Sequence, residues 1–281
     1  MIIVTTVAEL RDHLARTRAD GRRTAFVPTM GALHDGHLHL CDIARRNADV
    51  VILSIFVNPL QFGPAEDFDR YPRDLERDAR LVADRGVDLI FAPERDEVYP
   101  EGGAAVRVHA PELGQVLCGR FRPGHFEGVL TVVAKLFNMV QPDCAVFGQK
   151  DLQQAALIRR MVRDLDFPVD VLIGPIVREP DGLALSSRNA YLSSTERASA
   201  LALYRSLQAA QAAFSAGATD AAEVTDAAAA ILDAEAGVSA QYVEVVDPWS
   251  LATPARVERG HAVAVAAFAG GTRLIDNHVL E

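Results

Sequence analysis

An unbroken apolar run, VVILSIFVNP, occupies residues 50–59 and restricts the folds that this chain can adopt. A strand with one face in water alternates apolar and polar residues, whereas a strand buried on both faces is apolar throughout. Similar short runs alternate with helical patterns at residues 24–29, 87–93, 143–148 and 169–177. The sequence therefore predicts an α/β fold, with a Rossmann-like parallel sheet covered by helices on both faces.

The helices between these strands are expected over about residues 36–48, 69–86, 128–141 and 151–165, the last with Asp151 as its N-cap. Ligands of parallel sheets bind beyond the carboxyl ends of the strands. The bend at Pro28, the loop at Asn58 and the loop at Gly148 each follow a predicted strand. We therefore expect all three on one edge of the sheet.

The pattern changes near residue 176. An alanine-rich stretch up to about Ala236 keeps helical spacing, and three strand-like runs follow it, AQYVEVVD, HAVAVAAFAG and TRLIDN. This organisation predicts two domains. Residues 1–175 form the domain with the parallel sheet, and residues 176–281 form a smaller α+β domain.

Composition excludes several classes of protein. The net charge of −10 is unsuited to a general nucleic-acid binder, which neutralises phosphates with cationic side chains. No apolar run approaches the roughly 18 residues of a membrane span, and the first residues lack the pattern of a secretion signal. The three cysteines are widely spaced, as is usual for thiols in a reducing compartment. We expect a cytoplasmic protein without nucleic-acid or membrane partners.

The stretch PTMGALHDGHLHL (residues 28–40) holds three of the eight histidines. A metal site is one interpretation, but zinc needs three or four ligands and no second cluster of His or Cys lies nearby in the sequence. A second interpretation is that the histidines are ordinary surface or helix-end residues, and a third is a phosphate site. Gly31 and Gly36 permit close approach of the backbone to a ligand. The helix that starts here offers free N–H groups, and His34 and His37 add donors that can become cationic. Neither a GxxxxGK[ST] loop nor a GxGxxG motif occurs.

HDGH at residues 34–37 resembles the HxGH signature of the nucleotidyltransferase superfamily. The longer segments PTMGALHDGHLHL, SIFVNPLQFGPAEDFDRYPRDLERD, RPGHFEGVLTVVAKLFNMVQPDCAVFGQKDLQQ and REPDGLALSSRNAYLS resemble the pantothenate synthetases (pantoate–β-alanine ligases) in order and spacing. The resemblance covers nearly the whole chain. It implies an AMP-forming ligase that condenses (R)-pantoate with β-alanine, with ATP as substrate, through a pantoyl adenylate.

The same resemblance implies the site residues. The residues implied to bind ATP are Met30, Gly31, Ala32, Leu33, His34, Asp35, Gly36, His37, Gly148, Gln149, Lys150, Asp151, Val177, Leu185, Ser186, Ser187 and Arg188. Among these, His34, His37, Lys150 and Arg188 are implied to be catalytic. Gln61 and Gln154 would bind pantoate and β-alanine, and Asp78 matches an acidic position linked to Mg²⁺. A homodimer is implied as well.

Lys150 and the segment 184–189 each show a further feature in the sequence. Lys150 is one of only two lysines against 26 arginines, which hints that a compact point charge is needed at this position. Residues 184–189, ALSSRN, match a mobile phosphate-binding loop, although Leu185 stands where many family members have Met. We expect this loop to close over ATP and to be ordered by it. Two alternatives stay open: a nucleotide-binding regulatory protein without catalysis, and another HxGH nucleotidyltransferase acting on a small carboxylate or phosphate substrate.

Overall fold

The structure is a computed structural model that describes residues 1–64 and 66–281. The chain divides into two compact units. Unit 1 consists of Met1–Gln115, Gly119–Gly148 and Leu157–Gly174, and unit 2 consists of Val116–Cys118, Gln149–Ala156 and Pro175–Glu281. Each unit is thus assembled from segments that are not contiguous in the chain. The predicted domain boundary between residues 175 and 176 remains a prediction.

Unit 1 contains a six-stranded sheet in the order β1–β4–β3–β2–β5–β6. Every neighbouring pair of strands is parallel, which confirms the predicted fold class. The strands are β1 (Ile2–Val4), β2 (Thr24–Thr29), β3 (Val50–Ile55), β4 (Leu89–Phe91), β5 (Cys144–Gly148) and β6 (Asp170–Gly174). Only β1, a short strand at the edge of the sheet, has no counterpart among the predicted strands.

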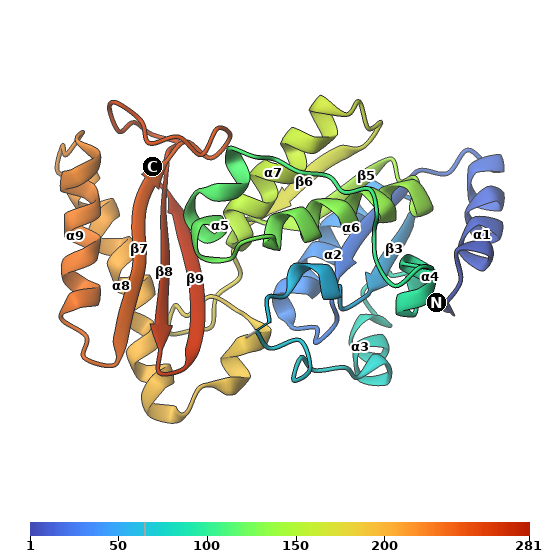
Figure 1. Ribbon diagram of the computed structural model, residues 1–281, viewed down its shortest axis with the longest axis horizontal. Coiled ribbons are helices and arrows are strands. Elements are labelled where there is room, and N and C mark those ends of the chain that lie inside the picture. Colours follow the sequence, from blue (N-terminus) through green and yellow to red (C-terminus); the bar gives the residue numbers. More distant parts are fainter. Residues whose placement is uncertain (65) are drawn as a thin grey trace. The chain divides into compact units, whose positions relative to one another are not determined.

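Helices precede or follow most of these strands (Figure 1). They are α1 (Val7–Ala19), α2 (Asp35–Asn47), α3 (Leu75–Val82), α4 (Arg95–Val98), α5 (Leu117–Phe121), α6 (His125–Val140) and α7 (Leu152–Asp164). Short 3₁₀ helices are η1 (Pro59–Gln61), η2 (Leu113–Gln115), η3 (Gln149–Asp151) and η4 (Ser187–Tyr191). The sequence of α7 runs from unit 2 into unit 1.

The predicted helix over residues 69–86 is wrong in length, because α3 covers only eight residues, Leu75–Val82. Asp74 is its N-cap, and the Asp74 side chain accepts a hydrogen bond from the Arg77 N–H. Pro72 disfavours helical geometry in the residue before it, so the helix cannot extend far towards residue 69. At the other end, Gly86 has a φ of +71°. Local capping thus outweighs the apolar spacing of the longer segment.

Both faces of the parallel sheet are covered, as its apolar strands require. Along β2, Ala25 and Val27 belong to one buried cluster that includes Leu38 of α2. Between them Phe26 points the other way, and its ring lies 6.5 Å from the ring of Phe137 in α6 in an edge-on arrangement. Alternate residues of a strand point to opposite faces, so α2 and α6 cover different faces of the sheet.

The strand order reverses direction at β2, which lies between β3 and β5. β2 pairs with β3 along all six of its residues but pairs with β5 only at Ala25 and Phe26. Pro28, which has no N–H to donate, lies beyond that short pairing. In open parallel sheets such a reversal marks the place where ligands bind. The three loops predicted to share an edge follow β2, β3 and β5, which are neighbouring parallel strands.

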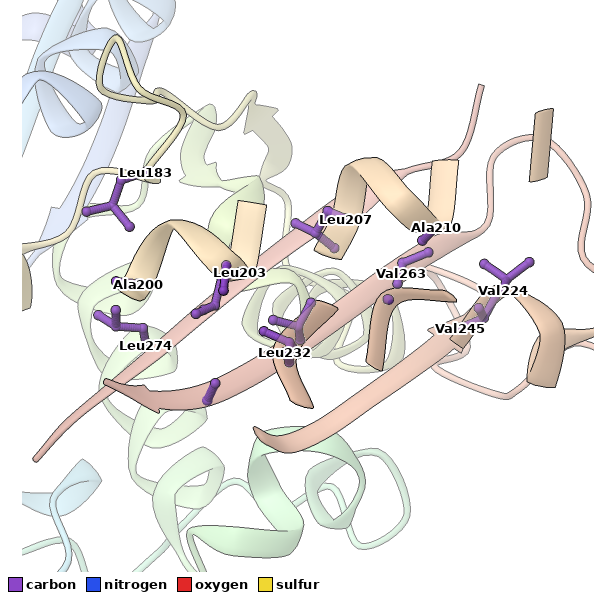
Figure 2. Packing of buried hydrophobic residues seen from close by; sticks show 14 of the residues in the cluster. Leu183, Ala200, Leu203, Leu207, Ala210, Val224, Leu232, Val245, Val263 and Leu274 are labelled. Atoms are coloured by element: carbon purple, nitrogen blue, oxygen red, sulfur yellow. The ribbon is translucent and has the colours of Figure 1, made fainter. Parts of the chain in front are cut away.

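Unit 2 contains an antiparallel sheet of β7 (Val238–Val246), β8 (Ala262–Ala269) and β9 (Thr272–Val279). Two helices, α8 (Ser194–Ser215) and α9 (Ala221–Asp233), pack on it. Figure 2 shows the resulting core, in which Leu203 and Leu207 of α8 and Leu232 of α9 gather with Val245 and Val263 of the sheet. This is the smaller α+β part that the sequence predicts.

Within residues 1–64 and 66–281, no helix is both long enough and apolar enough to cross a membrane.

Candidate active site

The turn between β2 and α2 follows an unusual backbone path. Gly31 has a φ of +81°, and Ala32, which carries a side chain, has a φ of +52°. A Cβ atom added at Gly31 would lie 3.0 Å from Asp78 Oδ2 and 3.0 Å from Ile55 Cγ2. Two consecutive residues in the left-handed region turn the chain sharply, and the first of them needs to be glycine. The turn thereby delivers His34 to the start of α2.

His34 and His37 cap the N-terminus of α2 in a reciprocal way. Nδ1 of His34 accepts a hydrogen bond from the Gly36 N–H at 3.2 Å, and Nδ1 of His37 accepts one from the His34 N–H at 3.4 Å. The two rings lie 4.1 Å apart. Because each Nδ1 atom is an acceptor, each neutral ring carries its proton on Nε2. The arrangement provides two Nε2–H donors at a helix N-terminus, where anions are stabilised.

Asp78 of α3 fixes the backbone of this turn through a hydrogen bond. Its side chain is 1% exposed, and Oδ1 accepts a hydrogen bond from the Leu33 N–H at 2.9 Å. Nη1 of Arg77 donates both to that Oδ1 atom and to the Leu33 carbonyl, each at 3.2 Å. Burial raises the pKa of Asp78, and the N–H groups of Leu33 and Ala32 oppose this rise only in part. Oδ1 of Asp78 therefore holds the backbone of the turn, while its buried Oδ2 atom has no hydrogen-bond partner among the described residues.

Asn58 and Gln61 occupy the loop after β3. Nδ2 of Asn58 donates to Oε1 of Gln61 at 3.1 Å, and Nε2 of Gln61 contacts Sδ of Met30 at 3.0 Å. The side chain of Gln61 is thus oriented at its oxygen end by Asn58 and at its nitrogen end by Met30. This contact brings a predicted pantoate residue together with the first residue of the predicted ATP-binding turn. The role of the Asn58 side chain was not predicted from the sequence.

The backbone of Gln61 is held by a second group that the sequence analysis missed. Nδ1 of His125 lies 2.7 Å from the Gln61 carbonyl, and Nη1 of Arg122 lies 2.9 Å from Nε2 of the same histidine. Since Arg122 can only donate, Nε2 of His125 accepts and its Nδ1–H donates to Gln61. Glu66 completes the group with two hydrogen bonds from Arg122, at 2.6 and 2.5 Å. Arg122 and His125 lie in the segment RPGHFEG and Glu66 lies in SIFVNPLQFGPAEDFDRYPRDLERD, but nothing in their spacing indicated that they contact Gln61.

Helix α6 approaches the same loop through Gly128. A Cβ atom added at Gly128 would lie 2.2 Å from the Leu60 carbonyl oxygen and 2.7 Å from the Gln61 nitrogen. A carbon atom cannot lie this close to a backbone oxygen, so either η1 or α6 would have to move to admit the added Cβ atom. Gly128 is the fourth residue of α6. Glycine is less favourable than alanine in a helix, and here it permits η1 to lie directly against α6.

Unit 2 carries the predicted residues that follow β5. Gln149, Lys150 and Asp151 form η3, and Asn277 of β9 fixes its backbone. Nδ2 of Asn277 donates to the carbonyls of Gln149 at 2.9 Å and of Lys150 at 3.0 Å. Gln149 returns a side-chain hydrogen bond to Oδ1 of Asn277 at 3.3 Å. η3 is therefore a fixed element, and Gln154 follows it in the first turn of α7.

The predicted phosphate-binding loop lies at the end of a short hairpin in unit 2. Leu185 N–H donates to the Val177 carbonyl at 3.0 Å, and Arg178 pairs with Ala184. Ser186 then caps η4, because its Oγ atom accepts a hydrogen bond from the Arg188 N–H at 3.3 Å. These contacts unite Val177, Leu185, Ser186 and Arg188 in one local structure.

Residues next to this loop tie it to the sheet of unit 2. Arg178 forms two hydrogen bonds to the carboxylate of Asp276, at 2.5 and 3.0 Å. Burial raises the pKa of Asp276, although the Arg178 guanidinium opposes the rise. Gly182, at the tip of the hairpin, has a φ of +100° and faces the ring of Tyr204, which a Cβ atom would meet at 2.1 Å. Gly182 is thus a turn glycine packed under an aromatic ring.

No group of three or more His, Cys, Asp or Glu side chains in the described part of the chain is arranged to hold a metal ion. Among the interpretations of the histidine stretch, the metal cluster therefore has no support in the described residues. In Asp78 the Oδ1 atom is occupied by Leu33 and Arg77, whereas the buried Oδ2 atom has no hydrogen-bond partner within residues 1–64 and 66–281, so Oδ2 is the oxygen that this carboxylate could offer a metal ion.

Comparison with known proteins covers almost the full chain. The profile of the family described as pantoate-beta-alanine ligase matches residues 2–279. A pantothenate synthetase of Moorella thermoacetica is 52% identical over 281 residues, which are 100% of this chain and 99% of the relative. Pantothenate synthetase 1 of Bradyrhizobium diazoefficiens is 54% identical over 281 residues, 100% of this chain and 98% of the relative.

Solved structures give the same result. The crystal structure of pantothenate synthetase from Thermus thermophilus matches with a TM-score of 0.94 at 50% identity, covering 99% of each chain. The crystal structure of pantoate-beta-alanine ligase from Francisella tularensis, complexed with beta-gamma ATP and beta-alanine, matches with a TM-score of 0.82 at 35% identity. That match covers 99% of this chain and 97% of the other. The similarity thus extends over both units.

Proposed function

This chain belongs to the pantoate–β-alanine ligase family, and on that basis we propose how its residues carry out the reaction. The enzyme condenses (R)-pantoate with β-alanine and gives pantothenate, AMP and pyrophosphate. ATP is its substrate, and pantoyl adenylate is the intermediate. It is therefore a ligase of pantothenate biosynthesis that forms an amide bond.

The first half-reaction forms pantoyl adenylate. A carboxylate oxygen of pantoate attacks the α-phosphorus of ATP, a new P–O bond forms, and the bond from that phosphorus to pyrophosphate breaks. His34 and His37 donate their Nε2–H groups to phosphate oxygens on which negative charge increases. Because each Nδ1 atom accepts a capping hydrogen bond, the neutral form of each ring has Nε2–H as its donor, and protonation of Nδ1 would break that hydrogen bond.

The second half-reaction transfers the acyl group. The amine nitrogen of β-alanine attacks the acyl carbon, the C–N bond forms, the bond from that carbon to AMP breaks, and the amine loses a proton. Gln61 and Gln154 bind pantoate through neutral amides, which hydrogen-bond hydroxyl and carboxylate groups without an ion pair that would weaken the nucleophile. The orientation of the Gln61 side chain by Asn58 and Met30 supports this assignment for Gln61.

The other predicted ATP-binding residues keep their assignments as parts of this proposal. Lys150 supplies a compact charge to the phosphates, and Arg188 supplies a planar pair of donors to pyrophosphate. The remaining residues assigned to ATP are Met30, Gly31, Ala32, Leu33, Asp35, Gly36, Gly148, Gln149, Asp151, Val177, Leu185, Ser186 and Ser187. The fixed backbone of η3 and the capped turn at Ser186 support these roles.

The metal ion, the assembly, the compartment and the domain boundary also belong to the proposal. Mg²⁺ would accompany ATP, held chiefly by phosphate oxygens and water, as is usual for this ion in ATP-dependent enzymes. Asp78 would contact the ion through Oδ2, the oxygen of that carboxylate without a hydrogen-bond partner in the described part of the chain. The protein is proposed to be a homodimer of the cytoplasm, with a domain boundary between residues 175 and 176.

The single observation that carries the residue assignment is the reciprocal histidine cap, which makes Nε2 the N–H donor of each neutral ring at the N-terminus of α2. The test measures release of pyrophosphate and AMP with ATP and pantoate, with and without β-alanine. We expect AMP and pantothenate only when β-alanine is present. Steady pyrophosphate release without β-alanine, with a stable nucleotide-linked product, would instead indicate another nucleotidyltransferase. No turnover under either condition would indicate a nucleotide-binding protein without catalysis.

A further inference from the structure

Tyr99 is a buried tyrosine of unit 1 that the proposed mechanism does not use. It follows α4 directly as its C-cap, and its side chain is 1% exposed. The hydroxyl donates a hydrogen bond to Oδ1 of Asn58 at 2.8 Å. The two residues are 41 positions apart in the sequence, so the contact depends on the tertiary fold.

Asn58 is itself buried, with 1% exposure, and its amide uses all of its hydrogen-bonding capacity. Oδ1 accepts from Tyr99 and, at 3.3 Å, from the Leu60 N–H. Nδ2 donates to the Gly128 carbonyl at 3.1 Å and to Oε1 of Gln61 at 3.1 Å. A flipped amide would set Nδ2 against the Leu60 N–H and Oδ1 against the Gly128 carbonyl. The orientation of Asn58 is therefore determined.

The Tyr99 hydroxyl makes the shorter of the two hydrogen bonds to Oδ1. Without it, Asn58 would keep only the 3.3 Å contact with Leu60 at that end of its amide. The Nδ2 end would then be less firmly placed against Gln61, since both ends belong to one planar group. We infer that Tyr99 is a positioning residue of the pantoate site, acting through Asn58 to hold the side chain of Gln61. The inference rests on the proposed role of Gln61 in binding pantoate.

The surroundings of Tyr99 keep the hydroxyl available as a donor. Burial raises the pKa of Tyr99 far above its ordinary value, so the group is protonated at any working pH. Its ring packs beside the ring of Phe56 at 6.1 Å and beneath the ammonium group of Lys135 at 5.7 Å. A phenylalanine would keep this packing and lose only the hydroxyl. Tyr99→Phe therefore isolates the hydrogen bond.

The test compares steady-state kinetics of Tyr99→Phe, Gln61→Ala and the double variant, with pantoate and ATP varied separately. Loss of one neutral hydrogen bond corresponds to about a 3- to 10-fold change. We expect Tyr99→Phe to raise KM for pantoate by that factor and to leave KM for ATP within about two-fold. In the Gln61→Ala background, where the side chain being positioned is absent, Tyr99→Phe should change KM for pantoate by less than about two-fold.

Tyr242→Phe is the matched control, because Tyr242 is a buried tyrosine of unit 2 whose hydroxyl lies 3.1 Å from Sγ of Cys118. It should leave KM for pantoate unchanged, and melting curves verify that all variants are folded. Equal rises in KM for pantoate and KM for ATP would overturn the positioning role of Tyr99 but not the role of Gln61 in binding pantoate. The same holds for an effect of Tyr99→Phe that persists in full without the Gln61 side chain. An unchanged KM for pantoate in Gln61→Ala would remove Gln61 from the pantoate site and overturn both.

Discussion

Replacing Gly128 by alanine tests whether the close approach of α6 to η1 sets the geometry of the pantoate site. The added Cβ atom would lie 2.2 Å from the Leu60 carbonyl oxygen, 2.4 Å from its carbon and 2.7 Å from the Gln61 nitrogen. All three are backbone atoms, which cannot rotate away as a side chain can. Ordinary contact needs about 3.5 Å, so η1 must move by about 1 Å and carry Gln61 with it.

Two opposing terms set the effect on stability. Overpacking of this kind costs about 1–3 kcal/mol, while alanine is favoured over glycine in a helix by about 1 kcal/mol. The net loss should therefore be about 0–2 kcal/mol, which lowers the melting temperature by a few degrees in a protein of this size. Activity should suffer more, because a displacement of about 1 Å at a binding group can reduce turnover by about 100-fold.

The assay measures kcat/KM for pantoate and for ATP in Gly128→Ala and compares them with the melting temperature. Gly103→Ala is the control, because it makes the same chemical change where a Cβ atom meets nothing within 4 Å. We expect kcat/KM for pantoate to fall by about 10- to 100-fold in Gly128→Ala and to stay near its original value in the control. A folded Gly128→Ala variant with unchanged pantoate kinetics would refute the argument from close packing.

Four further changes have defined outcomes. His37→Ala should slow adenylate formation by about 10²–10³-fold, measured as pyrophosphate release, whereas His39→Ala on the same helix should not. Asp78→Ala leaves the buried Leu33 N–H without its acceptor, so stability should fall by about 1–3 kcal/mol and kcat should drop; a tenfold shift in the Mg²⁺ requirement would in addition support Asp78 as a ligand of the ion. Burial raises the pKa of Glu66, but the Arg122 hydrogen bonds outweigh it and lower the pKa below its ordinary value. Glu66 thus stabilises the fold above about pH 4.3, and unfolding curves should show that this stability is lost at lower pH in the original protein and not in Glu66→Gln. Hydrogen exchange on residues 180–190 should slow when ATP and pantoate bind, and strong protection without ligand would exclude a closing loop.

Much of the sheet was predictable because buried parallel strands have a simple sequence signature. The runs around Val51 and Phe147 are almost entirely apolar, with Ser54 as a buried exception, and each forms a buried strand. The alternation of strands with helices also placed the loops after β2, β3 and β5 on one edge, since parallel order leaves no other arrangement. These inferences needed only local pattern and chain direction.

The hydrogen bonds that orient the site were not predictable, because they join residues far apart in the sequence. His125 reaches the backbone of Gln61 across 64 positions, and Asp78 reaches Leu33 across 45. No periodicity records such contacts. The histidine cap was not predicted for another reason. Ser, Thr, Asp and Asn are the usual N-caps, so no ordinary signal in the sequence indicates that the Nδ1 atom of His34 caps α2.

The interleaving of the two units bears on recombination between relatives. Residues 175–281 form unit 2 only together with Val116–Cys118 and Gln149–Ala156. Asn277 binds the carbonyls of Gln149 and Lys150, and Arg273 donates to Sγ of Cys118 at 3.3 Å. A chimera joined at one point near residue 175 would inherit these partners from different parents. An exchange that preserves unit 2 must therefore transfer three separate stretches of the gene. A single crossover cannot move unit 2 as a whole.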